Sequence, residues 1–160
     1  MTLTFFDGLF LFIAILLNTL ITIIFIVRYR GPEGLEHKIG YIVIACTIPL
    51  AIILINYILV GVDLWIIIYI TIIISFLIFE AILDYILKLS FRTNPKIAVP
   101  FVLFYYIAFW GLLAISFVIQ LMFGFIVFSF FMISVIITIY THKKDNDKMT
   151  LRKDNDKEQN

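Results

Sequence analysis

The sequence has 160 residues, of which 63% are hydrophobic and only 14% are charged, with a formal net charge of +1. A soluble domain is nearer half apolar and about a quarter charged, so this composition excludes a water-soluble globular fold. The single cysteine, Cys46, excludes an internal disulfide, a CxxC redox pair and a cluster of cysteine metal ligands. We therefore expect an integral membrane protein built from apolar helices.

Uncharged apolar runs between charged connectors predict the membrane spans. About 20 apolar residues are needed to cross a hydrocarbon core of roughly 30 Å, and the first run, residues 8–27, has this length. No Lys or Arg precedes it, which indicates a retained span rather than a cleavable signal peptide. The second and third runs, residues 39–60 and 64–87, are joined by a short turn at Gly61.

Residues 97–141 contain no Asp, Glu, Lys or Arg. One helix of this length would be about twice as long as the hydrocarbon core is thick. We therefore expect two spans, residues 97–118 and 122–141, joined by a tight turn within residues 120–124. The predicted fold is an all-α polytopic transmembrane helix bundle of five spans, with four spans as the alternative.

The distribution of basic residues predicts the orientation. With five spans and the N-terminus outside, all twelve Lys and Arg residues lie on the cytoplasmic side, as the positive-inside rule favours. Four spans would place the basic residues of the C-terminal tail outside. This tail, residues 142–160, has mixed charge and no aromatic residue, which predicts a disordered cytoplasmic segment. The expected location is the cell membrane, as a multi-pass protein.

Two carboxylates, Glu80 and Asp84, lie within the third predicted span. An ionisable group inside a bilayer is costly, so it is a candidate functional residue. The two are four residues apart and therefore share one helical face. Asp84 can pair with Lys88 one turn further on, whereas Glu80 has no basic residue at that spacing, which makes Glu80 the stronger candidate for an ion or proton site.

Polar side chains of the other spans lie at about the depth of Glu80 when residues are counted from the cytoplasmic ends. These candidates for the same site are Asn18, Thr47, Tyr105 and Ser134. Pro49 lacks an amide proton and frees the backbone carbonyl near Ala45, which could join this polar layer. The layer could bind a proton, a small cation or a polar headgroup. The alternative is structural, because such residues commonly form hydrogen bonds between transmembrane helices.

Motifs for other chemistry are missing from the sequence. It has no phosphate-binding glycine loop, no GxSxG and no HExxH. Two histidines are too few for a histidine-rich metal cluster, so we predict neither a metal nor a cofactor. The basic connectors lack the density of a nucleic-acid-binding surface, which leaves the lipid bilayer, a second copy of the chain or another membrane protein as expected partners.

Three classes of function stay open on this basis. We favour a non-catalytic membrane component or accessory subunit. The alternative is a small oligomeric transporter or channel for protons or cations that uses the intramembrane carboxylate Glu80. A third class is an intramembrane enzyme acting on a lipid headgroup, with Glu80 or Asp84 as general base. Because no second catalytic group is evident, we do not expect an enzyme.

Overall fold

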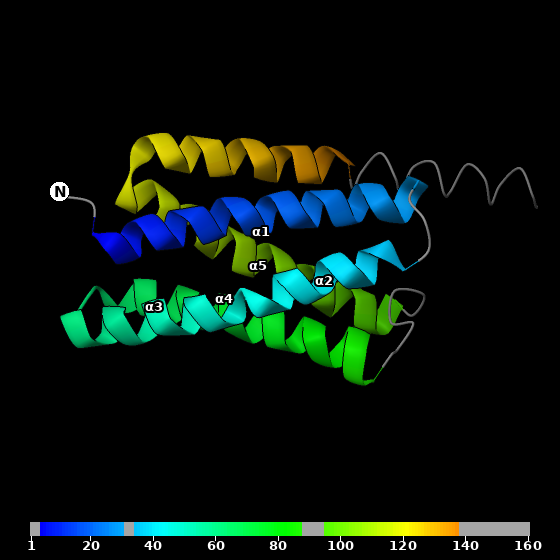
Figure 1. The fold of residues 1–160 in the computed structure, drawn as a ribbon, viewed down its shortest axis with the longest axis horizontal. Coiled ribbons are helices and arrows are strands. Elements are labelled where there is room, and N and C mark those ends of the chain that lie inside the picture. The colour runs from blue at the N-terminus through cyan, green and yellow to red at the C-terminus, as the bar shows by residue number, and fades with distance from the viewer. Residues whose placement is uncertain (1–3, 31–33, 88–94, 138–160) are drawn as a thin grey trace, which may run out of the picture.

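The computed structural model describes residues 4–30, 34–87 and 95–137. Within these ranges nearly every residue is helical and none is in a strand. Long helices run roughly alongside one another from one end of the molecule to the other (Figure 1). The predicted all-α bundle of apolar helices is therefore confirmed.

The first helix, α1, covers Phe5–Arg30 and begins with a hydrogen-bonded cap. The Asp7 amide donates to Thr4 Oγ1 at 3.2 Å, and the Thr4 amide donates to Asp7 Oδ2 at 3.0 Å. This reciprocal pair is a capping box, which satisfies two amides that a helix start leaves without partners.

The second span consists of two helices, α2 (Leu35–Ala45) and α3 (Thr47–Val60), with a break at Cys46. Pro49 has no amide proton, so it cannot bond to the Ala45 carbonyl as a residue four positions on would do in a regular helix. The span ends at Gly61, whose φ of 73° lies in the left-handed region that glycine adopts readily.

The third span is α4 (Leu64–Ala81), and it continues directly into the π turn η1 (Ile82–Ile86). The Leu87 amide donates to the Ile82 carbonyl, five residues back, at 2.8 Å. The fourth span, α5 (Pro95–Ile119), begins with proline, which suits the first position of a helix because its missing amide proton is not needed there.

The chain reverses at Gln120, within the turn expected at residues 120–124, and a last helix covers Leu121–Ile137. The reversal is tight, because a Cβ added at Gly124 would overlap with the Phe117 side chain. Four helical segments are long and apolar enough to cross a membrane, and the described part of the last helix is shorter. The remainder of the fifth predicted span, up to residue 141, and the predicted tail at 142–160 lie outside the described residues.

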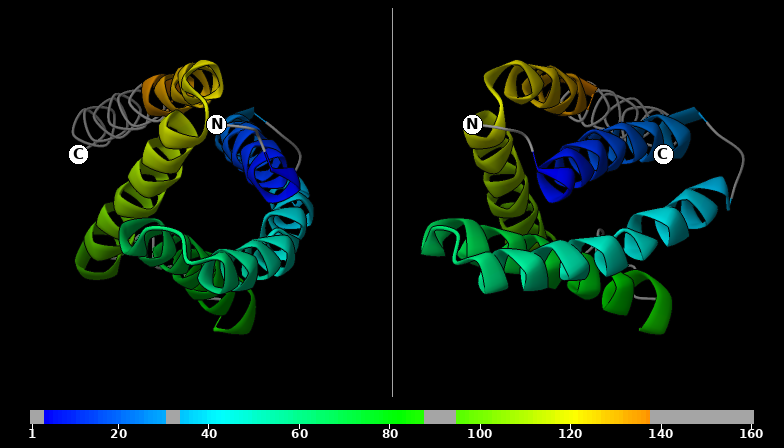
Figure 2. Two further views of the ribbon diagram at one scale, coloured as in Figure 1. Left: turned by 90° about the vertical axis from the view of Figure 1, so that its left-hand side faces the viewer. Right: turned by 60° about the vertical axis from the view of Figure 1, so that its left-hand side comes forward.

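Apolar side chains fill the interior of the bundle. The helix Leu121–Ile137 and the α3–α4 pair lie on opposite sides, with α1 and α5 between them (Figure 2). Helix α4 packs against α5, and α1 packs against α2, α3 and α5. Gly111 of α5 permits this close packing, because a Cβ there would overlap with the Tyr69 ring of α4. The fully buried core includes Phe10, Leu50, Ile53, Ile70, Leu112 and Ile115.

Candidate functional site

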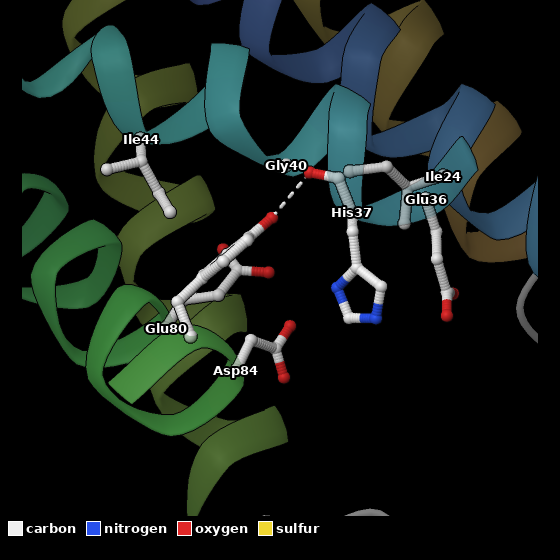
Figure 3. Close-up of a pocket in the computed structure, with 8 residues that line it drawn as sticks. Ile24, Glu36, His37, Gly40, Ile44, Glu80 and Asp84 are labelled. Atoms are coloured by element: carbon white, nitrogen blue, oxygen red, sulfur yellow. Dashed lines mark hydrogen bonds between the residues drawn. The ribbon is translucent and has the colours of Figure 1, made fainter. Parts of the chain in front are cut away.

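A small pocket lies between α1, α2 and the junction of α4 with η1, at the end of the bundle where α1 ends and α2 begins (Figure 3). Its lining residues are Ile24, Glu36, His37, Gly40, Ile44, Glu80, Asp84 and Tyr85. The free volume is about 10 Å³, roughly the room that one water molecule needs. The pocket therefore has room for a water molecule or a proton carried on one, and is far too small for a lipid headgroup.

Both carboxylates predicted from the sequence line this pocket. Glu80 comes from the last turn of α4, and Asp84 comes from η1. The two residues face His37 and Glu36 of α2 across the pocket (Figure 3). The Glu80 side chain is half-buried and its Oε2 atom is shielded from solvent. The pocket thus joins a shielded carboxyl group to side chains at the end of the bundle.

Glu36 and His37 were not among the predicted site residues. The second span was expected to begin at residue 39, so both residues were assigned to the preceding charged connector. The helix begins at Leu35 instead, which places Glu36 in its first turn, where the helix dipole favours an acidic side chain. His37 is exposed, and Glu36 is half-buried. An acidic residue near a helix start is the signal that could have indicated this earlier beginning.

Tyr85 is a further pocket residue that sequence reasoning missed, and the π turn explains why. In a continuous α-helix, two residues five positions apart, such as Glu80 and Tyr85, point about 140° away from each other. A π turn adds one residue to a turn, which brings residues five apart toward the same face. Because the turn η1 lies between them, Glu80, Asp84 and Tyr85 all line one pocket.

The Tyr85 side chain connects η1 to α2. Its hydroxyl donates to the His37 carbonyl at 2.7 Å, the bond drawn as a dashed line in Figure 3. Its ring lies 4.5 Å from the Tyr41 ring and 5.9 Å from the His37 ring, measured between centroids. A Cβ added at Gly40 would overlap with the Tyr85 hydroxyl. Gly40 is therefore the residue that permits this close approach.

Tyr105, another predicted site residue, lies in α5 close enough to Glu80 for the two groups to interact electrostatically. Its ring packs between aromatic neighbours, with centroids 4.5 Å from Phe109 and 5.8 Å from Phe76. The structure thus brings Tyr105 near Glu80, although Tyr105 does not line the pocket itself.

Asn18 and Ser134 form their hydrogen bonds elsewhere: those of Asn18 stay within α1, and Ser134 connects the last helix to α1. The Asn18 side-chain amide donates to the Ala14 carbonyl at 3.0 Å, and the Thr22 hydroxyl donates to the Asn18 carbonyl at 2.7 Å. The Thr22 and Ser134 hydroxyls lie 2.5 Å apart. Neither Asn18 nor Ser134 lines the pocket. Counting depth along a span places residues at a level, but it does not determine which neighbouring helix they face.

Thr47 lies in the first turn of α3, beside the break at Cys46. Its Oγ1 atom is buried and has no hydrogen-bond partner among the described residues. Thr47 is not part of the pocket lining. The predicted polar layer is therefore divided: Glu80 and Asp84 line the pocket with Tyr105 nearby, whereas the other three predicted residues lie elsewhere in the bundle.

A second polar contact, at the opposite end of the bundle, was also not predicted. The Tyr57 hydroxyl of α3 donates to Asp7 Oδ1 of α1 at 2.6 Å, and Tyr57 is only 5% exposed. Asp7 lies in the first turn of α1, where the helix dipole and the capping box both favour its negative charge. This contact fixes α1 to α3 and leaves the carboxyl group bonded on both oxygens.

Among the described residues, no group of three or more His, Cys, Asp and Glu side chains is arranged to hold a metal ion. The groups that line the pocket are instead suited to proton exchange, because carboxyl and imidazole groups transfer protons directly or through one water molecule.

Comparisons with protein-family models, with curated proteins and with solved structures gave no match for this chain.

Proposed function

We propose that this chain is the proton-binding subunit of a small membrane transporter or channel, with Glu80 as the group that takes up and releases the proton. The observation that carries this proposal is the pocket itself. Two carboxylates of the third span, Glu80 and Asp84, meet Glu36 and His37 of α2 around a space for about one water molecule. A water molecule in that space can pass a proton between these groups.

The surroundings of the pocket support a proton route from one end of the bundle. His37 is exposed, and histidine commonly acts as a proton shuttle in proteins. Asp84 and Tyr85 face the pocket from η1, Glu36 from α2 and the apolar Ile24 from α1, while Tyr105 of α5 lies near Glu80. Protons from bulk water therefore have ionisable groups on which to move inward.

The proposal places this end of the bundle in the cytoplasm and the protein in the cell membrane. The basic residues of the first connector, Arg28, Arg30 and Lys38, flank the end of α1 and the start of α2, and the positive-inside rule puts such residues on the cytoplasmic side. Apolar side chains such as Leu50, Ile53 and Ile70 fill the core beyond the pocket. A complete pathway would therefore need a second copy of the chain or a partner protein.

The test is carbodiimide labelling of the protein reconstituted in lipid vesicles. The reagent attacks protonated carboxyl groups, so labelling of Glu80 should decrease as the pH rises. Asp63, an exposed residue in the turn between α3 and α4, is the internal reference. Proton uptake by the same vesicles should be lost in Glu80→Gln and retained in Asp63→Asn. If labelling of Glu80 does not depend on pH and Glu80→Gln leaves proton uptake unchanged, the proposal is wrong.

A second candidate is the non-catalytic accessory subunit. The bonding of polar side chains away from the pocket favours it: Tyr57 bonds Asp7, and Thr22 contacts Ser134, as expected of groups that hold helices together. In this case a membrane protein partner would copurify with the chain, and Glu80→Gln would leave the activity of that complex intact. No observation favours the lipid-headgroup enzyme, since the pocket has room for about one water molecule.

A further inference from the structure

Tyr85 occupies the side of the pocket formed by α2. Its hydroxyl lies directly over Gly40 and donates to the His37 carbonyl at 2.7 Å. Because Gly40 has no side chain, the Tyr85 hydroxyl can occupy the space that a side chain at position 40 would otherwise fill. The remaining free volume is about that of one water molecule. Tyr85 is thus one of the residues that determine how large a ligand the pocket can take.

We propose that Tyr85 is the specificity-determining residue of this pocket: bonded to the His37 carbonyl, it closes the route to Glu80 against anything larger than a water molecule. When the hydroxyl leaves Gly40, the pocket admits larger solutes. The inference rests on the proposed function for its biological meaning, because it concerns what reaches the proton-binding residue. The closure itself can be tested without any proton being bound.

The local structure allows Tyr85 to move. Its hydroxyl donates to the His37 carbonyl, an uncharged acceptor, and a neutral hydrogen bond of this kind contributes little net stability. Inside α2 that carbonyl lies four residues before Tyr41, whose amide is its regular helical donor, so it keeps a partner when Tyr85 leaves. Tyr85 is only half-buried, and it lies in a π turn, a feature that often marks functional sites.

The experiment measures access to the pocket with a thiol. Cys46 is first replaced by Ala, and Ile44, a half-buried lining residue, by Cys. The rate at which a small water-soluble methanethiosulfonate modifies the Ile44→Cys thiol is then measured in vesicles. We expect slow modification with Tyr85 present. Tyr85→Phe, which keeps the ring and removes the hydrogen bond, should speed the reaction by about two- to threefold, the population change expected when one average hydrogen bond between membrane helices is lost.

Two further variants separate closure from general loosening of the fold. Tyr41→Phe removes a hydroxyl from the adjacent ring, which has no hydrogen bond among the described residues, and should leave the rate unchanged. Gly40→Ala should speed the reaction, because the new methyl group overlaps with the Tyr85 hydroxyl. In Tyr85→Phe that overlap is removed and the nearest ring atom, Cζ, lies 3.3 Å from the added Cβ, so Gly40→Ala should then have a smaller effect.

The outcomes distinguish this inference from the proposed function. Equal rates in the parent, Tyr85→Phe and Gly40→Ala would overturn the closure by Tyr85, even if labelling of Glu80 depends on pH. Faster thiol modification in both variants, with Tyr41→Phe unchanged, supports the closure even if Glu80 takes up no proton. Equal acceleration by Tyr85→Phe and Tyr41→Phe would show general loosening, and the inference would be wrong.

Discussion

Two tyrosine hydroxyls join helices at opposite ends of this bundle, with hydrogen bonds of nearly the same length. Tyr57 donates to Asp7 Oδ1 at 2.6 Å, whereas Tyr85 donates to the His37 carbonyl at 2.7 Å. The acceptors differ in kind, because the first is a carboxyl group and the second is a backbone carbonyl that also belongs to a helix. Tyr57 is buried, while Tyr85 is half-buried beside a pocket.

The difference shows that bond length alone does not indicate how firmly two helices are held. A hydrogen bond to a charged group is roughly twice as strong as a neutral one. Asp7 is also held by the capping box at the start of α1, so moving it would disrupt the helix end as well. We therefore expect the end of the bundle at Asp7 to be the rigid end and the end at Tyr85 to open more readily.

The largest effect should come from removing the carboxyl group at the rigid end. Asp7→Ala should lower the free energy of unfolding by about 2 to 3 kcal/mol, because it removes a strong interhelical hydrogen bond and a helix cap worth about 1 kcal/mol. Denaturation by dodecyl sulfate in mixed micelles measures this change. Asp63→Ala is the matched control, since Asp63 precedes α4 without a side-chain capping bond. Equal effects of the two substitutions would contradict a stabilising role of the Asp7 hydrogen bonds.

Removing only the hydroxyl group at the rigid end should have an intermediate effect. Tyr57→Phe should cost about 1.5 kcal/mol, near the upper limit for interhelical hydrogen bonds in membrane proteins. Tyr69→Phe, in the adjacent α4, serves as the control because the Tyr69 hydroxyl has no hydrogen bond among the described residues. The same denaturation measurement applies. A loss below that of Tyr85→Phe would reverse the comparison between the two ends.

The smallest effect on stability is expected at the pocket. Tyr85→Phe should cost about 0.5 kcal/mol, the average for such hydrogen bonds, because the His37 carbonyl keeps its helical partner. Tyr41→Phe should lie within about 0.5 kcal/mol of the parent, as for most substitutions away from specific contacts. A loss above about 1.5 kcal/mol in Tyr85→Phe would mean that this contact is as firmly held as the one at Asp7.

Much of the architecture could be predicted because a bilayer imposes simple rules. Uncharged runs of sufficient length predicted the spans, and the cost of an ionisable group in lipid singled out Glu80 and Asp84. Both residues line the pocket. These predictions depend on one residue or one segment at a time, which a single sequence can supply.

The missing parts of the site depend on relations between helices. Glu36 and His37 were read as connector residues, and their place in the pocket follows only from the packing of α2 against η1. The π turn that turns Tyr85 toward the pocket has no signature in local composition. Asn18 and Ser134 were assigned to the level of Glu80, but Asn18 bonds within its own helix and Ser134 contacts Thr22 of α1. A sequence indicates how deep a residue lies along its helix more readily than which neighbouring helix its side chain faces.

The break at Cys46 divides the second span into two helices that contact different parts of the bundle. Helix α3 is hydrogen-bonded near its far end, from Tyr57 to Asp7 of α1. Helix α2 instead contributes Glu36, His37, Gly40 and Ile44 to the pocket. Helix α2 has 11 residues and is therefore about 16 Å long. It meets α3 at the break, where the Ala45 carbonyl lacks its usual amide donor. A tilt of α2 by about 10° around the break would move its far end, beside the pocket, by about 3 Å, the diameter of a water molecule.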